Sequence, residues 1–106
     1  MQTGVTTGVV HLILPPHSFT QRNGTPGFVQ TFVIVDTFAQ SLNSDVWRHK
    51  IVVWNEQAKN LNIEMNRVYR FGHFKMKPVK GNCEYPGQDD YEVHLSPIST
   101  ITEVSV

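Results

Sequence analysis

Short runs rich in apolar residues, separated by polar segments, recur along the chain, and this pattern predicts β-structure. Five runs rich in β-branched and aromatic residues are typical of strands. They cover Val5–Leu14, Phe28–Asp36, Val46–Trp54, Val68–Lys77 and Asp90–Leu95, followed by a β-prone tail, Ser96–Val106. Two glycines inside these runs, Gly8 and Gly72, predict a bulge or bend in the first strand and a bulge in the fourth.

One helix is expected, over Asn55–Met65, with Asn55 as its N-cap. Loops are predicted where Gly, Pro, Asn, Ser and other polar residues gather, at His17–Gly27 and Pro78–Asp89. The segment Thr37–Asp45 is expected to connect the second and third strands, with a loop over Gln40–Asp45. Five strands with one short helix between the third and fourth is the order of an OB-fold, an all-β Greek-key barrel. We therefore expect residues 1–106 to form a single OB-fold domain, as a module of a longer chain or complex.

The third strand has two different faces. Side chains alternate along a strand, so Trp47, His49, Ile51 and Val53 should face a core. The opposite face carries Arg48, Lys50, Val52 and Trp54. Cations beside an indole are what a base-stacking surface for single-stranded nucleic acid requires, although solvated strand faces also carry Arg and Lys. In an OB-fold this face lies between the two longest predicted loops.

The fifth strand alternates in the same way. Tyr91, Val93 and Leu95 are expected to point inward, and Glu92 and His94 outward. Tyr69 and Phe74 of the fourth strand are expected to be packing residues rather than stacking ones.

Charge is polarised although the formal net charge is zero. The segment 46–80 holds eight basic and two acidic residues, and the remainder holds one basic and seven acidic residues. A basic region of this size can hold phosphates, with a strong dependence on salt.

Other chemistry has little support in the sequence. The only cysteine, Cys83, excludes a disulfide framework, and the five histidines lack the spacing of a zinc site, so no metal or cofactor is expected. Nucleophile, phosphate-loop and dinucleotide motifs are missing, which argues against an enzyme. No apolar run approaches the length of a membrane span. We expect an intracellular protein, nuclear or, in a bacterium, cytoplasmic.

The second half of the chain resembles the single-stranded-DNA-binding OB domains of the replication protein A large subunit. The similarity lies in Trp54-Asn55-Glu56-Gln57, in Asn66-Arg67-Val68-Tyr69 and in Asp90-Tyr91-Glu92, and covers roughly residues 28–96. Bacterial single-stranded-DNA-binding proteins are a more distant resemblance. The family's strand-two turn is replaced here by Val35-Asp36-Thr37 and a longer insertion, typical of a specialised relative such as a telomeric or meiotic protein.

The resemblance implies non-enzymatic binding of single-stranded DNA, or RNA, in replication, repair, recombination or telomere maintenance. Trp54 stands at the family's stacking aromatic and Lys50 at a basic contact. Tyr85 is the second stacking candidate if one residue is inserted; without the insertion that position falls on Glu84. The expected nucleic-acid-binding residues are Trp54, Lys50, Arg48, Tyr85, Arg22, Lys75 and Lys77. The alternative is an OB domain that binds other OB-fold subunits or domains and makes little contact with DNA.

Overall fold

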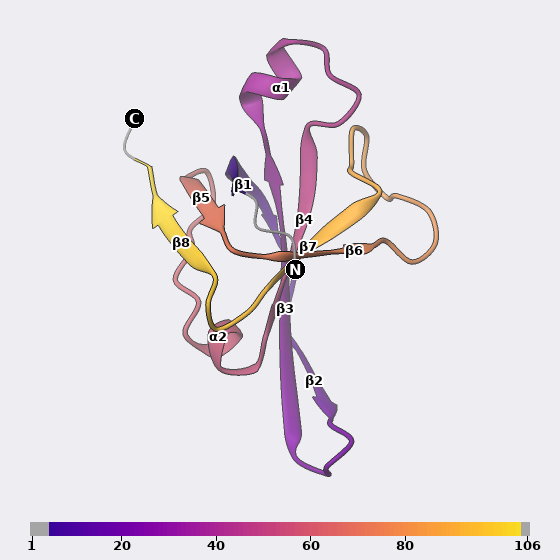
Figure 1. The fold of residues 1–106 in the computed structure, drawn as a ribbon, viewed down its shortest axis with the longest axis vertical. Coiled ribbons are helices and arrows are strands. Elements are labelled where there is room, and N and C mark those ends of the chain that lie inside the picture. Colours follow the sequence, from indigo (N-terminus) through magenta and orange to yellow (C-terminus); the bar gives the residue numbers. More distant parts are fainter. Residues whose placement is uncertain (1–4, 105–106) are drawn as a thin grey trace.

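The computed structural model describes residues 5–104, which form eight strands and two short helices (Figure 1). In chain order these are β1 (Val5–Ile13), β2 (His17–Thr20), β3 (Pro26–Val35), α1 (Thr37–Ser41), β4 (Arg48–Trp54), α2 (Asn55–Lys59), β5 (Val68–Gly72), β6 (Lys75–Pro78), β7 (Tyr91–Leu95) and β8 (Thr100–Glu103). Each of the five predicted strands has a counterpart here. Within the described range, no helix is long and apolar enough to cross a membrane.

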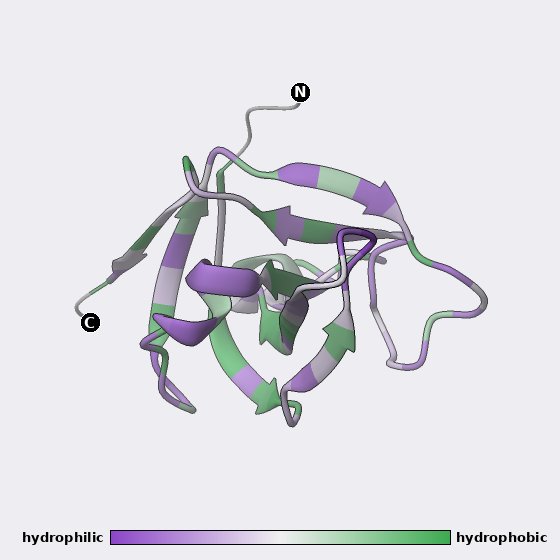
Figure 2. Cartoon of the chain, turned by 90° about the horizontal axis from the view of Figure 1, so that it is seen from below, coloured by the Kyte–Doolittle hydropathy of each residue, from purple (hydrophilic) through white to green (hydrophobic). Residues whose placement is uncertain are grey.

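All eight strands belong to one sheet that curls around a common interior (Figure 2). Its hydrogen-bonded order is β6-β7-β4-β3-β1-β5-β8, and β2 is added to β3. Only His73 and Phe74 separate β5 from β6, yet β5 pairs with β1 while β6 pairs with β7. This short bend joins the two sides of the sheet and closes the barrel. With β5 and β6 taken together, the strands and the position of α2 match the predicted OB arrangement.

The core lies inside this curl and follows the predicted alternation. Fully buried side chains come from every side of the barrel: Val10, Phe32, Ile34, Ile51, Val53, Phe71 and Val93. Burial of each such side chain contributes about 1.5–3 kcal/mol. Tyr69 and Phe74 are packing residues, as predicted. Tyr91 was expected to point inward, and this was wrong: it pairs with Pro78 at the start of β7 and is 48% exposed.

Three predictions for the first half of the chain were wrong. The segment His17–Gly27 is not one loop, because β2 pairs with the start of β3 and makes a long hairpin. The segment Thr37–Asp45 contains α1, whose first turn is capped by the Asp36 carboxylate, which accepts a hydrogen bond from the Ala39 amide (3.1 Å). The register shift in β1 falls between Val10 and Leu12, not at Gly8.

The second half also departs from expectation at local points. The helix α2 has only five residues, and Asn55 does not cap it. Asn55 instead adopts a left-handed backbone (φ 53°), and its side chain accepts a hydrogen bond from the Phe28 amide (3.1 Å) at the start of β3. The fourth predicted strand is divided at His73, which has φ 56°, one residue after the predicted bulge at Gly72. The β-prone tail supplies β8, and its last two residues lie outside the described range.

Candidate nucleic-acid interface

The outer face of β3, β4, β7 and β6 brings together four of the residues predicted to bind nucleic acid. Directly paired residues on neighbouring strands point to the same face of a sheet. Lys75 pairs with His94 and Lys77 with Glu92, and the parallel register of β4 and β7 puts Val52 beside His94. By the same alternation, Lys50 and Trp54 lie on this face, together with Lys75 and Lys77. We call this surface the outer face.

The floor of the outer face is formed by apolar side chains that have little contact with solvent. Val33 and Val35 of β3 are 1% and 7% exposed, and Val52 of β4 is 5% exposed, although none of them points into the barrel core. A small recess of about 60 Å³ remains above Val33 and Lys50. Its other walls are Leu14, after β1, and residues between Val79 and Gln88. The connections that follow β1 and β6 therefore meet over this part of the sheet, as an OB groove requires.

Three rings gather at one end of the outer face, around Trp54. Phe19 of β2 meets the indole at 90° with 5.7 Å between ring centroids, and His94 lies nearly parallel to it at 5.9 Å. The indole Nε1–H donates a hydrogen bond to His94 Nδ1 (3.0 Å). Phe19 reaches across β3 because Gly27 has no side chain, and a Cβ there would collide with the Phe19 ring. We call Phe19, Trp54 and His94 the aromatic end.

Lys50 lies in the middle of the outer face and is paired with an acid. Its Nζ is 3.6 Å from Glu92 Oε2, and both side chains are partly buried. Glu92 Oε1 lies 2.7 Å from His94 Nε2. A continuous set of polar contacts therefore runs from Lys50 through Glu92 and His94 to Trp54.

The opposite end of β4 is occupied by the loop between β6 and β7. Arg48 lies about 20 Å from Trp54, six residues along the strand. Its guanidinium donates to the Pro86 carbonyl (3.1 Å) and sits 4.6 Å from the Trp47 ring centroid and 5.7 Å from that of Tyr85. Trp47 was predicted to be a core residue, and this was wrong, because it is only half-buried. Its indole fills the space above Gly87. We call Trp47, Arg48, Tyr85 and Gly87 the loop end.

His49 adds a further contact at the loop end. Its ring is mostly buried, as expected, and its Nδ1 has no hydrogen-bond partner among the described residues. That atom lies 3.6 Å from Asp89 Oδ2, which is too long for a hydrogen bond. The Nε of Arg48 is likewise buried without a partner among the described residues.

The remaining predicted residues are exposed. Arg22 lies in the turn between β2 and β3, close to Gly24 (φ 84°). The turn is held by Gln21, which donates to the Pro26 carbonyl (3.0 Å). Lys75 and Lys77 stand on β6 at the edge of the outer face, and neither forms an ion pair with another residue of 5–104. Tyr85 and Glu84 both line the recess, and only Tyr85 is half-buried.

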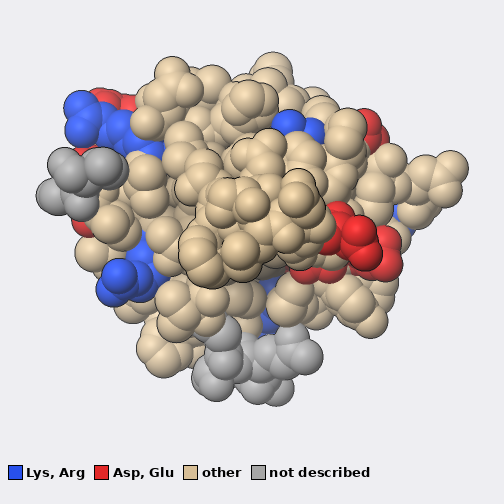
Figure 3. Space-filling view, turned by 90° about the horizontal axis from the view of Figure 1, so that it is seen from above, with Lys and Arg blue, Asp and Glu red and all other residues tan. Residues whose placement is uncertain are grey.

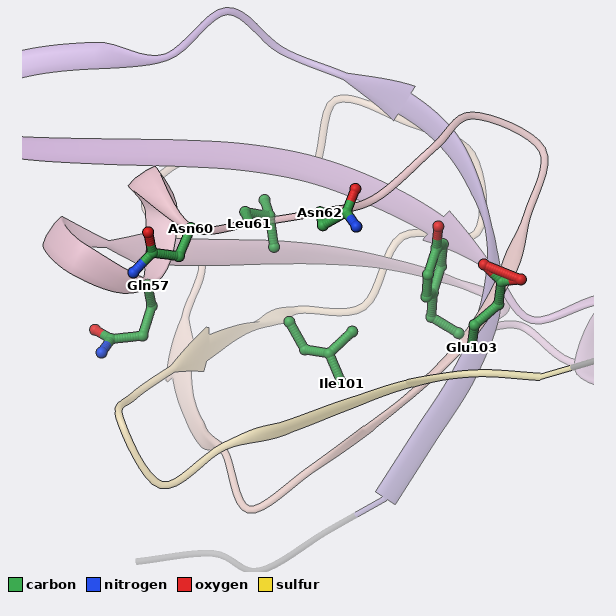
Figure 4. Close-up of a pocket in the computed structure, with 7 residues that line it drawn as sticks. Gln57, Asn60, Leu61, Asn62, Ile101 and Glu103 are labelled. Carbon is green, nitrogen blue, oxygen red and sulfur yellow. The ribbon is translucent and has the colours of Figure 1, made fainter.

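A larger cavity of about 500 Å³ lies elsewhere, between the end of α2 and β8 (Figure 4). Its lining combines amide side chains with apolar ones: Gln57, Asn60, Asn62, Leu61, Tyr69, Ile101 and Glu103. Glu103 is already paired with Arg67 (3.2 Å). No group of three or more His, Cys, Asp or Glu side chains in residues 5–104 is arranged to hold a metal ion.

Comparison with known proteins identifies the fold. No family model matches the chain, and neither does any curated protein sequence. A chain of a replication protein A heterotrimer bound to ssDNA superposes over 100% of this chain and 23% of its own length, with TM-score 0.76 and 14% identity. The chain resembles the OB-fold domains of replication protein A. The predicted fold class and resemblance are confirmed.

Two archaeal structures match over most of their own length as well. The replication factor A related protein of Methanobacterium thermoautotrophicum has 27% identity and TM-score 0.69, with 96% of this chain and 79% of that one covered. The second OB-fold domain of replication protein A from Methanococcus maripaludis has 15% identity and TM-score 0.66, with 99% and 86% covered. A replication protein A-like OB-fold is consistent with single-stranded DNA binding.

Within this replication protein A-like fold, Phe19 of the aromatic end and Glu92 and His94 of the outer face were not among the residues predicted to bind nucleic acid. Phe19 was assigned to a loop, although His17-Ser18-Phe19-Thr20 has the alternation of a short strand. Glu92 and His94 were expected to point outward, and they do, but their contacts with Lys50 and Trp54 depend on the parallel pairing of β4 and β7. Sequence alternation gives the face of a residue but not its cross-strand partner.

Proposed function

We propose that this chain binds single-stranded DNA without catalysis, across the outer face of β3 and β4. The observation that carries the proposal is the placement of Trp54 and Lys50 on one face, between the β2–β3 hairpin and the loop after β6. An accessible ring offers bases a stacking surface, worth about 1–3 kcal/mol per base. Trp54 stacks one base at the aromatic end, and Tyr85 stacks another near the loop end.

The basic residues divide into two groups in this proposal. Lys75 and Lys77 are exposed on β6, and Arg22 is exposed in the hairpin turn, so these three contact phosphates. Lys50 contacts a phosphate after exchanging its pair with Glu92. Arg48 acts mainly by holding the loop that carries Tyr85, because its guanidinium is already bonded to Pro86. The resulting affinity is modest and depends on salt through the exposed lysines.

The test is binding of a labelled single-stranded DNA oligonucleotide at low and moderate salt. Trp54→Ala should weaken binding by about ten-fold or more, the equivalent of one stacked base. Trp54→Phe is the matched control, because it keeps a ring and should keep most of the affinity. Equal binding by wild type and Trp54→Ala would show that DNA does not bind at the aromatic end. Binding of an RNA oligonucleotide of the same sequence shows whether the chain prefers DNA or RNA. Degradation of the oligonucleotide when Mg²⁺ is added would indicate a nuclease.

A second candidate function is contact with other OB-fold subunits or domains. The connection between β3 and β4 exposes large apolar side chains, with Phe38 71% and Leu42 64% exposed. Figure 3 views the molecule from the α1 end and shows a broad uncharged area with acidic side chains on one side. The matched replication protein A chain is part of a heterotrimer. No DNA binding at about 50 mM salt, where phosphate contacts are strong, would favour this function over the first.

In either role we propose that the chain is one module of a longer chain or complex. The processes that need such a module are replication, repair, recombination and telomere maintenance, so we propose that it acts in the nucleus or, in a bacterium, in the cytoplasm. Co-purification of the tagged chain from its own cells, with and without nuclease, separates partners held by protein contacts from partners held through DNA. Survival of all partners after nuclease treatment would support the protein-binding role.

A further inference from the structure

His94 is a buried histidine at the centre of the aromatic end. It is 7% exposed, and its ring lies nearly parallel to the Trp54 indole. Its Nδ1 accepts the hydrogen bond that the indole Nε1–H donates (3.0 Å). The imidazole therefore lies beside the N–H edge of the indole and fixes the direction of the indole's only polar bond.

Glu92 determines which ring nitrogen of His94 carries the proton. A carboxylate only accepts hydrogen bonds, and Glu92 Oε1 lies 2.7 Å from His94 Nε2. The proton is therefore on Nε2, which leaves Nδ1 free to accept from the indole. Lys50 lies 3.6 Å from the other oxygen of Glu92 and helps to keep this carboxylate in place.

We propose that neutral His94, held in its Nε2–H tautomer by Glu92, is a positioning residue that orients Trp54 for base stacking. This inference rests on the proposed function, because it gives Trp54 its role. Without His94 Nδ1, the indole N–H has no acceptor in its present orientation and turns toward solvent. The stacking surface then loses the fixed geometry that keeps the entropic cost of binding low.

Two substitutions separate the two nitrogens of the ring. His94→Asn keeps an oxygen acceptor where Nδ1 lies but does not reach Glu92. His94→Gln places its amide near the Nε2 position and removes the acceptor from the Nδ1 position. We expect His94→Gln to weaken binding of a single-stranded DNA oligonucleotide by about three- to ten-fold, the equivalent of one hydrogen bond. His94→Asn should stay within about two-fold of wild type, a small part of that energy.

A measurement without DNA tests the hydrogen bond itself. The Trp54 indole N–H signal is assigned in an NMR spectrum by its disappearance in Trp54→Phe. It should exchange slowly with solvent in wild type and in His94→Asn, and quickly in His94→Gln. The ¹⁵N shifts of the His94 ring should show Nδ1 without a proton.

The pH dependence adds a readout that a purely structural role would not move. Acidification through about pH 8 to 5 covers the range in which histidines become charged. A charged ring carries N–H groups on both nitrogens, so its Nδ1 can no longer accept from the indole. The charged groups around the ring are Glu92 on β7, Lys50 on β4 and Lys75, its register partner on β6. Relative to free indole at the same pH, the Trp54 N–H of wild type should lose its protection where His94 becomes charged, whereas that of His94→Asn should keep it.

The outcomes are distinct. Slow exchange that persists in His94→Gln, or a proton on Nδ1, overturns the positioning role. So does unchanged oligonucleotide affinity in His94→Gln when the indole N–H is released. If wild type binds no oligonucleotide while the NMR results are as expected, the proposed function fails and the positioning role falls with it, while the Trp54–His94 hydrogen bond stands.

Discussion

The two ends of β4 use the same kinds of residue in different ways. At the loop end, Arg48 lies between Trp47 and Tyr85, so cation and aromatics serve to hold a connection against the sheet. At the aromatic end, Trp54 and Phe19 are packed against each other but the hairpin that carries Phe19 leaves both partly accessible. A cation beside an aromatic ring on a strand therefore does not by itself indicate a ligand site. Such a pair can bind a ligand only where the adjoining loop does not already occupy the cation and the ring.

The largest effect should come from Gly87 at the loop end. It has φ 71°, and a Cβ there would collide with the Trp47 indole. Gly87→Ala combines a left-handed conformation with overpacking, so we expect a loss of about 2–4 kcal/mol in the free energy of unfolding, measured with urea. Gly24→Ala is the matched control, because its φ is 84° but nothing lies within 4 Å of the added Cβ. It should lose only about 1–2 kcal/mol. Equal losses would show that Trp47 does not pack on the loop.

Arg48 gives the next effect and separates a structural cation from a phosphate contact. Arg48→Ala removes the bond to Pro86 and the contact with two rings, and should destabilise the protein by about 1–3 kcal/mol. The dependence of oligonucleotide affinity on salt should keep its slope. Lys77→Ala, from the exposed edge of the outer face, should instead leave stability unchanged and lower the slope by about one. If Arg48→Ala lowers the slope of oligonucleotide affinity against salt, Arg48 contacts a phosphate after all.

How far the sequence could predict these two ends follows from what alternation encodes. It gave the face of Lys50, Val52 and Trp54 correctly, because the parity of a strand is a local property. It failed for Trp47, which lies just before β4 begins and so is not held by the strand's parity. It also could not place Arg48 under Pro86, since the two are 38 residues apart and meet only when the barrel forms.

The same limit applies to the fold. The five barrel strands and the helix between β4 and β5 are encoded in periodicity and could be predicted. The division of β5 from β6 could not, because a histidine, not a glycine, takes the positive φ. The strand β2 was hidden in a loop-like composition of Asn, Gly and Pro, which belongs to the turn that follows it.

Phe19 should give a smaller effect, confined to the aromatic end. Phe19→Ala removes an edge-to-face contact with Trp54, worth about 0.5–1.5 kcal/mol. We expect oligonucleotide affinity to fall by about two- to ten-fold and the intrinsic fluorescence of Trp54 to change, measured in a Trp47→Phe background. The matched control is Phe38→Ala, at the far end of β3 on α1, which should change neither property. An effect of Phe38→Ala equal to that of Phe19→Ala would mean that the hairpin has no special part in binding.

The smallest effect should be on the reactivity of Cys83, in the loop between β6 and β7. Partial desolvation raises the pKa of the Cys83 thiol, and the charges of Asp90 and Asp89 raise it further. Its Sγ contacts the Asp89 carbonyl (3.6 Å) and Asp90 Oδ1 (3.7 Å). A raised pKa means less thiolate, the reactive form, at a given pH, so alkylation by iodoacetamide should be slow near neutral pH. Asp90→Asn removes one of the negative charges, lowers the pKa and should speed alkylation by a few-fold, whereas Asp45→Asn, in the β3–β4 connection, should not. If Arg48→Ala releases the loop, it should speed alkylation as well, which ties the reactivity of this one thiol to the contacts at the loop end of β4.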